Sequence, residues 1–248
     1  FIIIMKLKYI TCSGANEHTN IDELLALAKE YPMMEIGIQV SDKKITDNPA
    51  RFDWIIALQE KVAAQKLAPN IALHVNGNWV QQFANRAMIP ELEYFLSLGN
   101  GSNGRLISRL QINFLIGNDY RINFGRFCQA MTDNARLPIV LPYNDQNAAF
   151  VHCLHNKSIK FDCLFDSSHG EGVLPQQQQP PVFRNCLQGY SGGLSADNVA
   201  EQLQKLSLVV KPKRSIYIDA EGKLKGSNGH LDLQKCEAYI KNALSALD

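Results

Sequence analysis

The sequence lacks the features of membrane proteins and of secreted disulfide scaffolds. It contains no uninterrupted apolar run of about 18 residues, the shortest typical length of a bilayer-spanning helix. Its 6 cysteines form no C-x-x-C pair and are scattered over 248 residues, which is atypical of a disulfide framework. We therefore expect reduced thiols, no membrane partner and a cytoplasmic location. Residues 1–4 are too few for a signal peptide, and we expect them to be an extension before a natural start at Met5.

The sequence also lacks an excess of either charge. Lysine and arginine together number 25, and aspartate and glutamate 24, which leaves a formal net charge of +1. This balance predicts no broad basic face, so we expect no nucleic-acid partner. Hydrophobic residues make up 46% of the chain, which is enough for a full globular core. We expect a monomer or a homodimer.

Short apolar runs recur along the whole chain. Most are nearly continuous in apolar residues, which is typical of parallel strands covered on both faces. Helical patterns fill many of the gaps, for example over 20–31, 49–66, 195–206 and 231–247. This alternation predicts one (β/α)₈ TIM barrel over residues 1–248. A doubly wound open sheet is the alternative, although no G-x-G-x-x-G follows the first run. The runs are 6–13, 34–41, 70–77, 109–117, 137–145, 161–168, 186–193 and 215–222.

Two strand ends carry candidates for acid–base chemistry, because barrel enzymes place their chemistry where the strands end. Asp166 ends the apolar run "FDCLFD", where a buried carboxylate is costly unless it is paired or used. Cys12 lies next to the end of the first run. A partly buried carboxyl group can donate a proton, and a thiolate can accept one. The alternatives are a loop-capping role for Asp166 and a core position for Cys12.

Two glycine turns predict an anion site. Gly192 and Gly193 end the seventh run and precede a helix, and Gly222 ends the eighth run. Glycines let the backbone approach a ligand closely and expose N–H groups, and barrels often bind phosphate between these two loops. The alternative is two tight turns without a ligand.

Several motifs together resemble the phosphoribosylanthranilate isomerase family. The chain has "YITCSG" where the family has K-I-C-G, "GIQV" for "GFVF" and "LQINF" for "VQLHG". It then has "CLFDSS" for "LLDS", "SGGLSADNV" for "AGGLNPENV" and "IDAEG" for "VDVSSG". The matches run in order over nearly the whole chain and are best in the last three runs.

The resemblance implies a cofactor-free and metal-free Amadori rearrangement, in which an aminoaldose phosphate becomes an aminoketose phosphate. Asp166 would be the general acid that opens the furanose ring, and Cys12 the general base that removes the C2 proton. The phosphate-binding positions implied by the matched motifs are Gly192, Gly193, Glu221 and Gly222. The substrate-binding positions are Lys43, Lys44, Gln111 and Asp219.

The chain departs from the family at Glu221, which stands where the family has a serine. A carboxylate that points at a phosphate repels it, unless Lys223 or Lys225 compensates. The partner expected is a small phosphorylated sugar-type substrate. Two other functions remain open: a different barrel enzyme acting on a sugar phosphate, and a non-catalytic barrel that has lost the ancestral activity.

Overall fold

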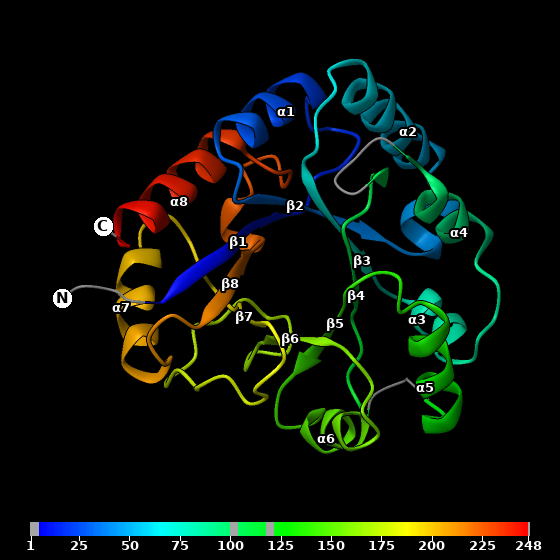
Figure 1. The fold of residues 1–248 in the computed structure, drawn as a ribbon. Coiled ribbons are helices and arrows are strands. Elements are labelled where there is room, and N and C mark those ends of the chain that lie inside the picture. Colours follow the sequence, from blue (N-terminus) through cyan, green and yellow to red (C-terminus); the bar gives the residue numbers. More distant parts are fainter. Residues whose placement is uncertain (1–4, 100–103, 118–121, 248) are drawn as a thin grey trace.

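Eight parallel strands form a closed barrel in the computed structural model, which describes residues 5–99, 104–117 and 122–247. Each strand pairs with the next along the chain, and β8 pairs with β1 to close the ring. Figure 1 views the ring along its axis, with helices around it. The predicted TIM barrel is confirmed, whereas the expected extension over 1–4 lies outside the described residues. The strands are β1 (Lys6–Ser13), β2 (Met34–Val40), β3 (Asn70–Val75), β4 (Arg109–Ile112), β5 (Ile139–Tyr143), β6 (Asp162–Phe165), β7 (Gln188–Tyr190) and β8 (Ser215–Ala220).

The helices cover the barrel unevenly. Two of them connect β3 to β4, whereas the described residues 166–187 between β6 and β7 form no helix. The sequence predicts a loop at this crossover, because "PQQQQPP" (175–181) places prolines that disfavour a helix interior. The α-helices are α1 (Ile21–Glu30), α2 (Pro49–Ala64), α3 (Asn78–Ala84), α4 (Pro90–Ser97), α5 (Phe124–Asp133), α6 (Ala148–Asn156), α7 (Val199–Val209) and α8 (Leu233–Ser245). A π-helical turn, η1 (Asp42–Thr46), and a 3₁₀ turn, η3 (Gly222–Leu224), follow β2 and β8.

Capping residues set where the helices begin. The side chain of Asn20 accepts hydrogen bonds from two N–H groups in the first turn of α1, and Asp232 does the same for α8. Leu24 and Leu25 of α1 are fully buried against the barrel. Most strands of the structure end earlier than the apolar runs that predicted them. The last residues of those runs therefore lie in loops at the end of the barrel.

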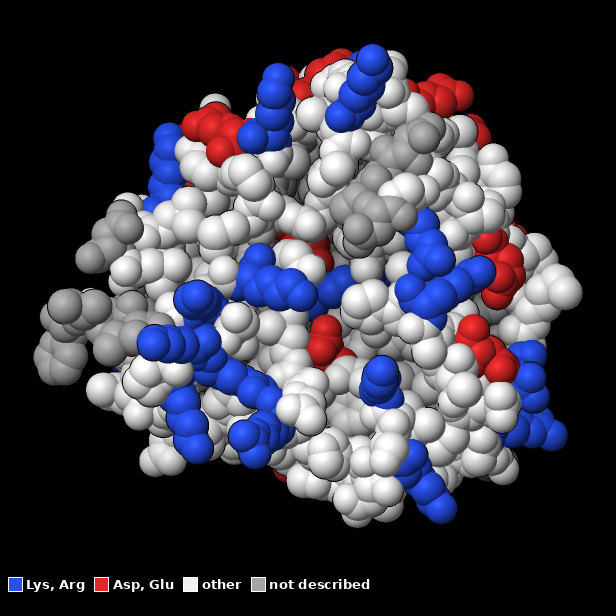
Figure 2. All heavy atoms as spheres, in the orientation of Figure 1, with Lys and Arg blue, Asp and Glu red and all other residues white. Residues whose placement is uncertain are grey.

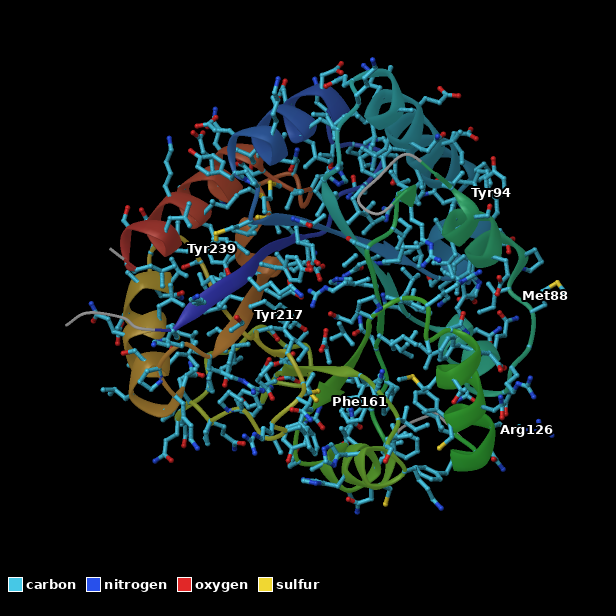
Figure 3. All side chains as sticks on the ribbon, in the orientation of Figure 1. Met88, Tyr94, Arg126, Phe161, Tyr217 and Tyr239 are labelled. Atoms are coloured by element: carbon cyan, nitrogen blue, oxygen red, sulfur yellow. The ribbon has the colours of Figure 1, made fainter. Side chains whose placement is uncertain are left out.

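Side chains of the strands alternate between two layers. Figure 3 shows Tyr217 of β8 inside the ring of strands, and Tyr239 of α8 on the helix side. Inside the barrel, Arg109 forms two hydrogen bonds to Glu35, at 2.7 Å from Nε and 2.5 Å from Nη2. The hydroxyl of Thr11 donates to the same carboxylate at 2.9 Å. The rings of Tyr9 and Tyr217 lie 4.6 and 4.2 Å from the guanidinium carbon. This buried ion pair, which the apolar strand patterns did not predict, fills the middle of the barrel.

Basic side chains gather at the end of the barrel where the strands begin, which faces the viewer in Figure 2. Across residues 157–162, 184–188, 211–216 and 5–8, which surround the starts of β6, β7, β8 and β1, Asp162 is the one acidic residue. The expectation of no broad basic face is therefore wrong at this end, because a balanced total charge says nothing about its distribution. The absence of a nucleic-acid partner stays a prediction. The basic residues are Lys157, Lys160, Arg184, Lys211, Lys213, Arg214, Lys6 and Lys8.

Across the described ranges, no helix combines the length and apolar character needed to cross a bilayer.

Candidate active site

A cavity of about 770 Å³ opens where the strands end. Its wall takes side chains from the ends of β2 to β8 and from the loops that follow. The volume is within the usual range for small-molecule sites, and the position agrees with the general rule for TIM barrels. The cavity brings together seven of the predicted site residues: Gln111, Asp166, Gly192, Gly193, Asp219, Glu221 and Gly222.

Cys12 does not line this cavity. Its side chain is fully buried in the layer between β1 and the helices, in hydrogen-bonding contact with Cys236 of α8. That contact, together with burial and the nearby charge of Asp219, raises the pKa of Cys12 well above its ordinary value. The predicted role of Cys12 as the general base therefore has no support in the geometry, because a buried thiol with a raised pKa neither meets a substrate nor ionises readily.

Ser13 occupies the inward position that the sequence assigned to Cys12. Its Oγ donates a hydrogen bond to Asp219 Oδ1 at 2.7 Å. Gly37 on the neighbouring strand leaves the space for this hydroxyl, because a Cβ at Gly37 would lie 2.3 Å from Ser13 Oγ. The family motif has its cysteine directly before glycine, and Ser13 directly precedes Gly14 here. The inward side chain at this end of β1 is thus a hydroxyl paired with a carboxyl group.

Asp219 is the most perturbed carboxyl group in the cavity wall. It is only 7% exposed, and burial raises its pKa to about 7. The hydrogen bond from Ser13 opposes this rise, whereas the carboxylates of Glu35 and Glu221 add to it. A carboxyl group with a pKa near neutrality can both take and return a proton at physiological pH.

Asp166 faces the cavity from the end of β6, and its oxygens organise the loop that follows. Oδ1 accepts hydrogen bonds from the N–H and the hydroxyl of Ser168, at 2.9 and 2.7 Å. Oδ2 accepts one from Gly170 N–H at 2.8 Å. The loop-capping alternative is therefore realised in the structure, and the general-acid role of Asp166 stays a prediction.

The glycine pair after β7 lies under this same loop. A Cβ at Gly192 would lie 2.7 Å from the carbonyl oxygen of Val173, and a Cβ at Gly193 2.8 Å from that of Gly172. Both glycines have positive φ, at 95° and 69°. Close packing and backbone conformation thus both require glycine here. Within the described part of the chain, no hydrogen bond occupies the N–H of either glycine.

Glu221 enters the cavity beside the predicted phosphate loop. Its carboxylate accepts hydrogen bonds from Gln39 Nε2 at 2.6 Å and from Lys225 Nζ at 3.0 Å. Lys44 is half-buried nearby, where burial lowers its pKa and the Glu221 carboxylate opposes that change. Lys43 is exposed, and neither Lys43 nor Lys44 lines the cavity. The predicted contact of these two lysines with the substrate therefore has no support in the geometry.

A closed ring of hydrogen bonds joins the ends of β3 and β4. Asn76 Nδ2 donates to His74 O at 2.7 Å, and Asn113 Nδ2 donates to Asn76 Oδ1 at 3.0 Å. Gln111 Nε2 donates to Asn113 Oδ1 at 2.9 Å and makes a long contact of 3.5 Å with His74 Nδ1. Burial lowers the pKa of His74 to about 4, so its imidazole is neutral at physiological pH. Of this set, the sequence assigned Gln111 to substrate binding and placed His74, Asn76 and Asn113 at strand ends. For His74, a substrate contact and a loop or core position were both open.

The described residues contain no group of three or more histidine, cysteine, aspartate or glutamate side chains arranged to hold a metal ion.

The fold is similar to that of several solved structures. TrpF from Jonesia denitrificans is 17% identical, with a TM-score of 0.54, over 96% of this chain and 97% of that one. Phosphoribosylanthranilate isomerase from Thermotoga maritima is 15% identical, with a TM-score of 0.54, over 96% and 98%. A mutant tryptophan synthase α-subunit from Pyrococcus furiosus is 13% identical, with a TM-score of 0.55, over 97% of both chains.

No protein-family model and no curated protein sequence matches this chain. At the identities above, the structural likeness concerns the fold alone. The resemblance read from the sequence motifs is confirmed at that level: the chain is a TIM barrel with the fold of phosphoribosylanthranilate isomerase and of the tryptophan synthase α-subunit.

Proposed function

We propose that this barrel is an acid–base enzyme that interconverts the aldose and ketose forms of a small phosphorylated sugar derivative. The observation that carries the proposal is Asp219, a buried carboxyl group in the cavity wall with a pKa of about 7. Carboxyl groups tuned close to the operating pH are typical of general bases. Asp166 supplies a second carboxyl group to the same cavity, from a strand separated from β8 only by β7.

The proposed reaction follows the rearrangement of an aminoaldose phosphate. An acid, assigned to Asp166, protonates the ring oxygen; the bond from this oxygen to C1 breaks, and the nitrogen lone pair forms a C=N bond. Asp219 then removes the proton from C2. The electron pair of the C–H bond forms a C1=C2 bond while the C=N electrons return to nitrogen, and the resulting enol converts to the 2-ketone. Ser13 holds the carboxyl group of Asp219 in place throughout.

Backbone groups after β7 and β8 support a phosphate position at one side of the cavity. Gly192, Gly193 and Gly222 lie in the cavity wall, and Lys223 and Lys225 also line it. In the proposal, the backbone N–H groups of the three glycines bind the phosphate. In this proposal Lys225 offsets the charge of Glu221, to which it is bonded.

The second candidate is a ligand-binding barrel without turnover. Two observations favour it: the thiol at Cys12 lies outside the cavity, and the oxygens of Asp166 are engaged by their own loop. A binding barrel would retain the cavity but would not exchange the C2 proton of a bound sugar.

Proton exchange at C2 distinguishes the two candidates. The chain is incubated in D₂O with phosphoribosylanthranilate, ribose 5-phosphate or glucosamine 6-phosphate, and deuterium at C2 is followed by NMR. We expect exchange with at least one of these compounds, a loss on the order of 100-fold or more in Asp219→Asn, and no change in Asp53→Asn, an exposed aspartate on α2. Binding without exchange would support the non-catalytic barrel.

A further inference from the structure

The hydrogen-bonded ring of His74, Asn76, Gln111 and Asn113 forms one wall of the cavity, which we call the amide wall. Its members come from two adjacent strands, β3 and β4, and the loops directly after them. Because each side chain is held by its neighbour, the wall is ordered before any ligand binds. Fixed polar groups of this kind reduce the ordering that binding would otherwise require.

The ring leaves hydrogen-bonding capacity unused. A primary amide has two N–H donors and an oxygen with two lone pairs. Asn76 and Asn113 each use one N–H donor and one oxygen lone pair within the ring. Each therefore keeps one N–H donor and one lone pair for a ligand. Gln111 spends its amide nitrogen on Asn113 and His74, and its Oε1 accepts no hydrogen bond from the described residues. The wall therefore offers paired donors and acceptors, the combination that a row of hydroxyl groups satisfies.

The cavity offers little to an aromatic ligand group. Phe114 is the one phenylalanine, tyrosine or tryptophan side chain in its described lining, and it is only 4% exposed. Its ring packs edge-on against Phe127 and Phe150, at 5.6 Å between ring centres in both pairs. An aryl group placed against the amide wall would leave the free donors and acceptors without partners, which is unfavourable once water is displaced.

We propose that the amide wall binds the hydroxyl groups of a second, sugar-like arm of the substrate, so that the ligand is hydroxylated on both sides of its reacting carbon rather than carrying an aryl amine. The proposal rests on the proposed function and specifies its substrate class. The phosphorylated arm lies toward the glycine turns after β7 and β8, and the second arm toward β3 and β4. A cavity of about 770 Å³ has room for both arms.

A matched pair of ligands tests the proposal. Trehalose 6-phosphate and phenyl glucoside 6-phosphate share a phosphorylated glucose and differ in the second ring, which is a sugar in one and a benzene ring in the other. Affinities are measured by calorimetry for the full chain and for Gln111→Leu. Asn113→Ala, at a half-buried residue directly after β4, is the second variant if Gln111→Leu does not fold. Gln204→Leu, on the exposed face of α7, is the control.

We expect trehalose 6-phosphate to bind on the order of 10–100-fold more tightly than the phenyl compound. A donor or acceptor of the amide wall that the benzene ring leaves without a partner lowers affinity by about this factor. The preference should shrink at least about fivefold in Gln111→Leu or Asn113→Ala and remain in Gln204→Leu. Equal affinities, or tighter binding of the phenyl compound, would overturn the inference while leaving the proposed function intact. If neither compound nor inorganic phosphate binds, the proposed function fails and the inference fails with it.

Discussion

Replacing Asp219 by asparagine should stabilise the protein at alkaline pH. Asp219 is held in the barrel with a pKa of about 7, against an ordinary value of 3.8. The folded state therefore keeps a proton between about pH 4 and pH 7 that the unfolded state releases. For an acid whose pKa is raised on folding, the free energy of unfolding falls as pH rises through this window. Above pH 7 the ionised carboxylate is a cost that the neutral amide of asparagine does not carry.

The size of the effect follows from the two pKa values. A difference of about 3 pKa units, at about 1.4 kcal/mol each, corresponds to about 4 kcal/mol between the acid and alkaline limits. Between pH 5 and pH 8 the same linkage relation gives about 2.5 kcal/mol. Ser13 can donate its hydrogen bond to the asparagine oxygen as it does to Asp219 Oδ1, so this contact is retained in the variant.

Urea unfolding at pH 5 and pH 8 measures the difference directly. Asp219→Asn should gain about 2.5 kcal/mol relative to the unmodified protein on going from pH 5 to pH 8, and Asp53→Asn should gain nothing. A difference between Asp219→Asn and the unmodified protein that is the same at both pH values would refute the reasoning, since it would mean that Asp219 does not titrate in this window. A gain at pH 8 accompanied by lost activity would identify the buried carboxyl group as retained for chemistry at the expense of stability.

Three further predictions test other parts of the structure. Cys12→Ala should keep C2 proton exchange within about threefold, because the thiol lies outside the cavity; a hundredfold loss would restore Cys12 as the base. Glu35→Gln should lower the free energy of unfolding in urea by about 3–5 kcal/mol, because it leaves Arg109 buried without its countercharge; a loss below about 1 kcal/mol would contradict a tight pair. Gly192→Ala should lower the free energy of unfolding by about 1–3 kcal/mol in the same assay and weaken phosphate binding, because its Cβ would lie 2.7 Å from Val173 O; an unchanged urea unfolding curve would show that the loop moves without cost.

The sequence was sufficient to predict the barrel. All eight strands fall within predicted apolar runs, because parallel strands covered on both faces need apolar residues at nearly every position. The barrel fold in turn predicts that the site lies at the strand ends. Asp166 and Asp219 do line the cavity there.

Which face of its strand each side chain occupies was harder to predict. Side chains in a strand alternate between the two faces, so an error of one residue moves a side chain from the cavity to the helix layer. In "TCSG" the small residues Thr11, Cys12 and Ser13 give no size contrast, and the family motif drew attention to the cysteine. The polar pair Thr11 and Ser13, two positions apart, was the available sign that the inward face lies there.

The ion pair of Glu35 and Arg109 escaped prediction for a different reason. The two residues are 74 positions apart, and each stands in an apolar run whose other members suggest a uniformly apolar interior. Their pairing depends on the curvature of the barrel, in which β2 and β4 flank β3 and direct these two side chains into the same interior space. No local pattern carries that information.

The pH dependence of C2 proton exchange tests the central claim most directly. The rate is measured in D₂O buffers from pH 5 to pH 9, for the unmodified protein and for Asp219→Asn, with whichever of the three sugar phosphates exchanges. If Asp219 is the base, the rate of the unmodified protein rises with pH to a plateau, with a midpoint near 7, and the variant loses on the order of 100-fold or more at the plateau. Exchange that persists in Asp219→Asn, or that is absent at every pH in the unmodified protein, would contradict it.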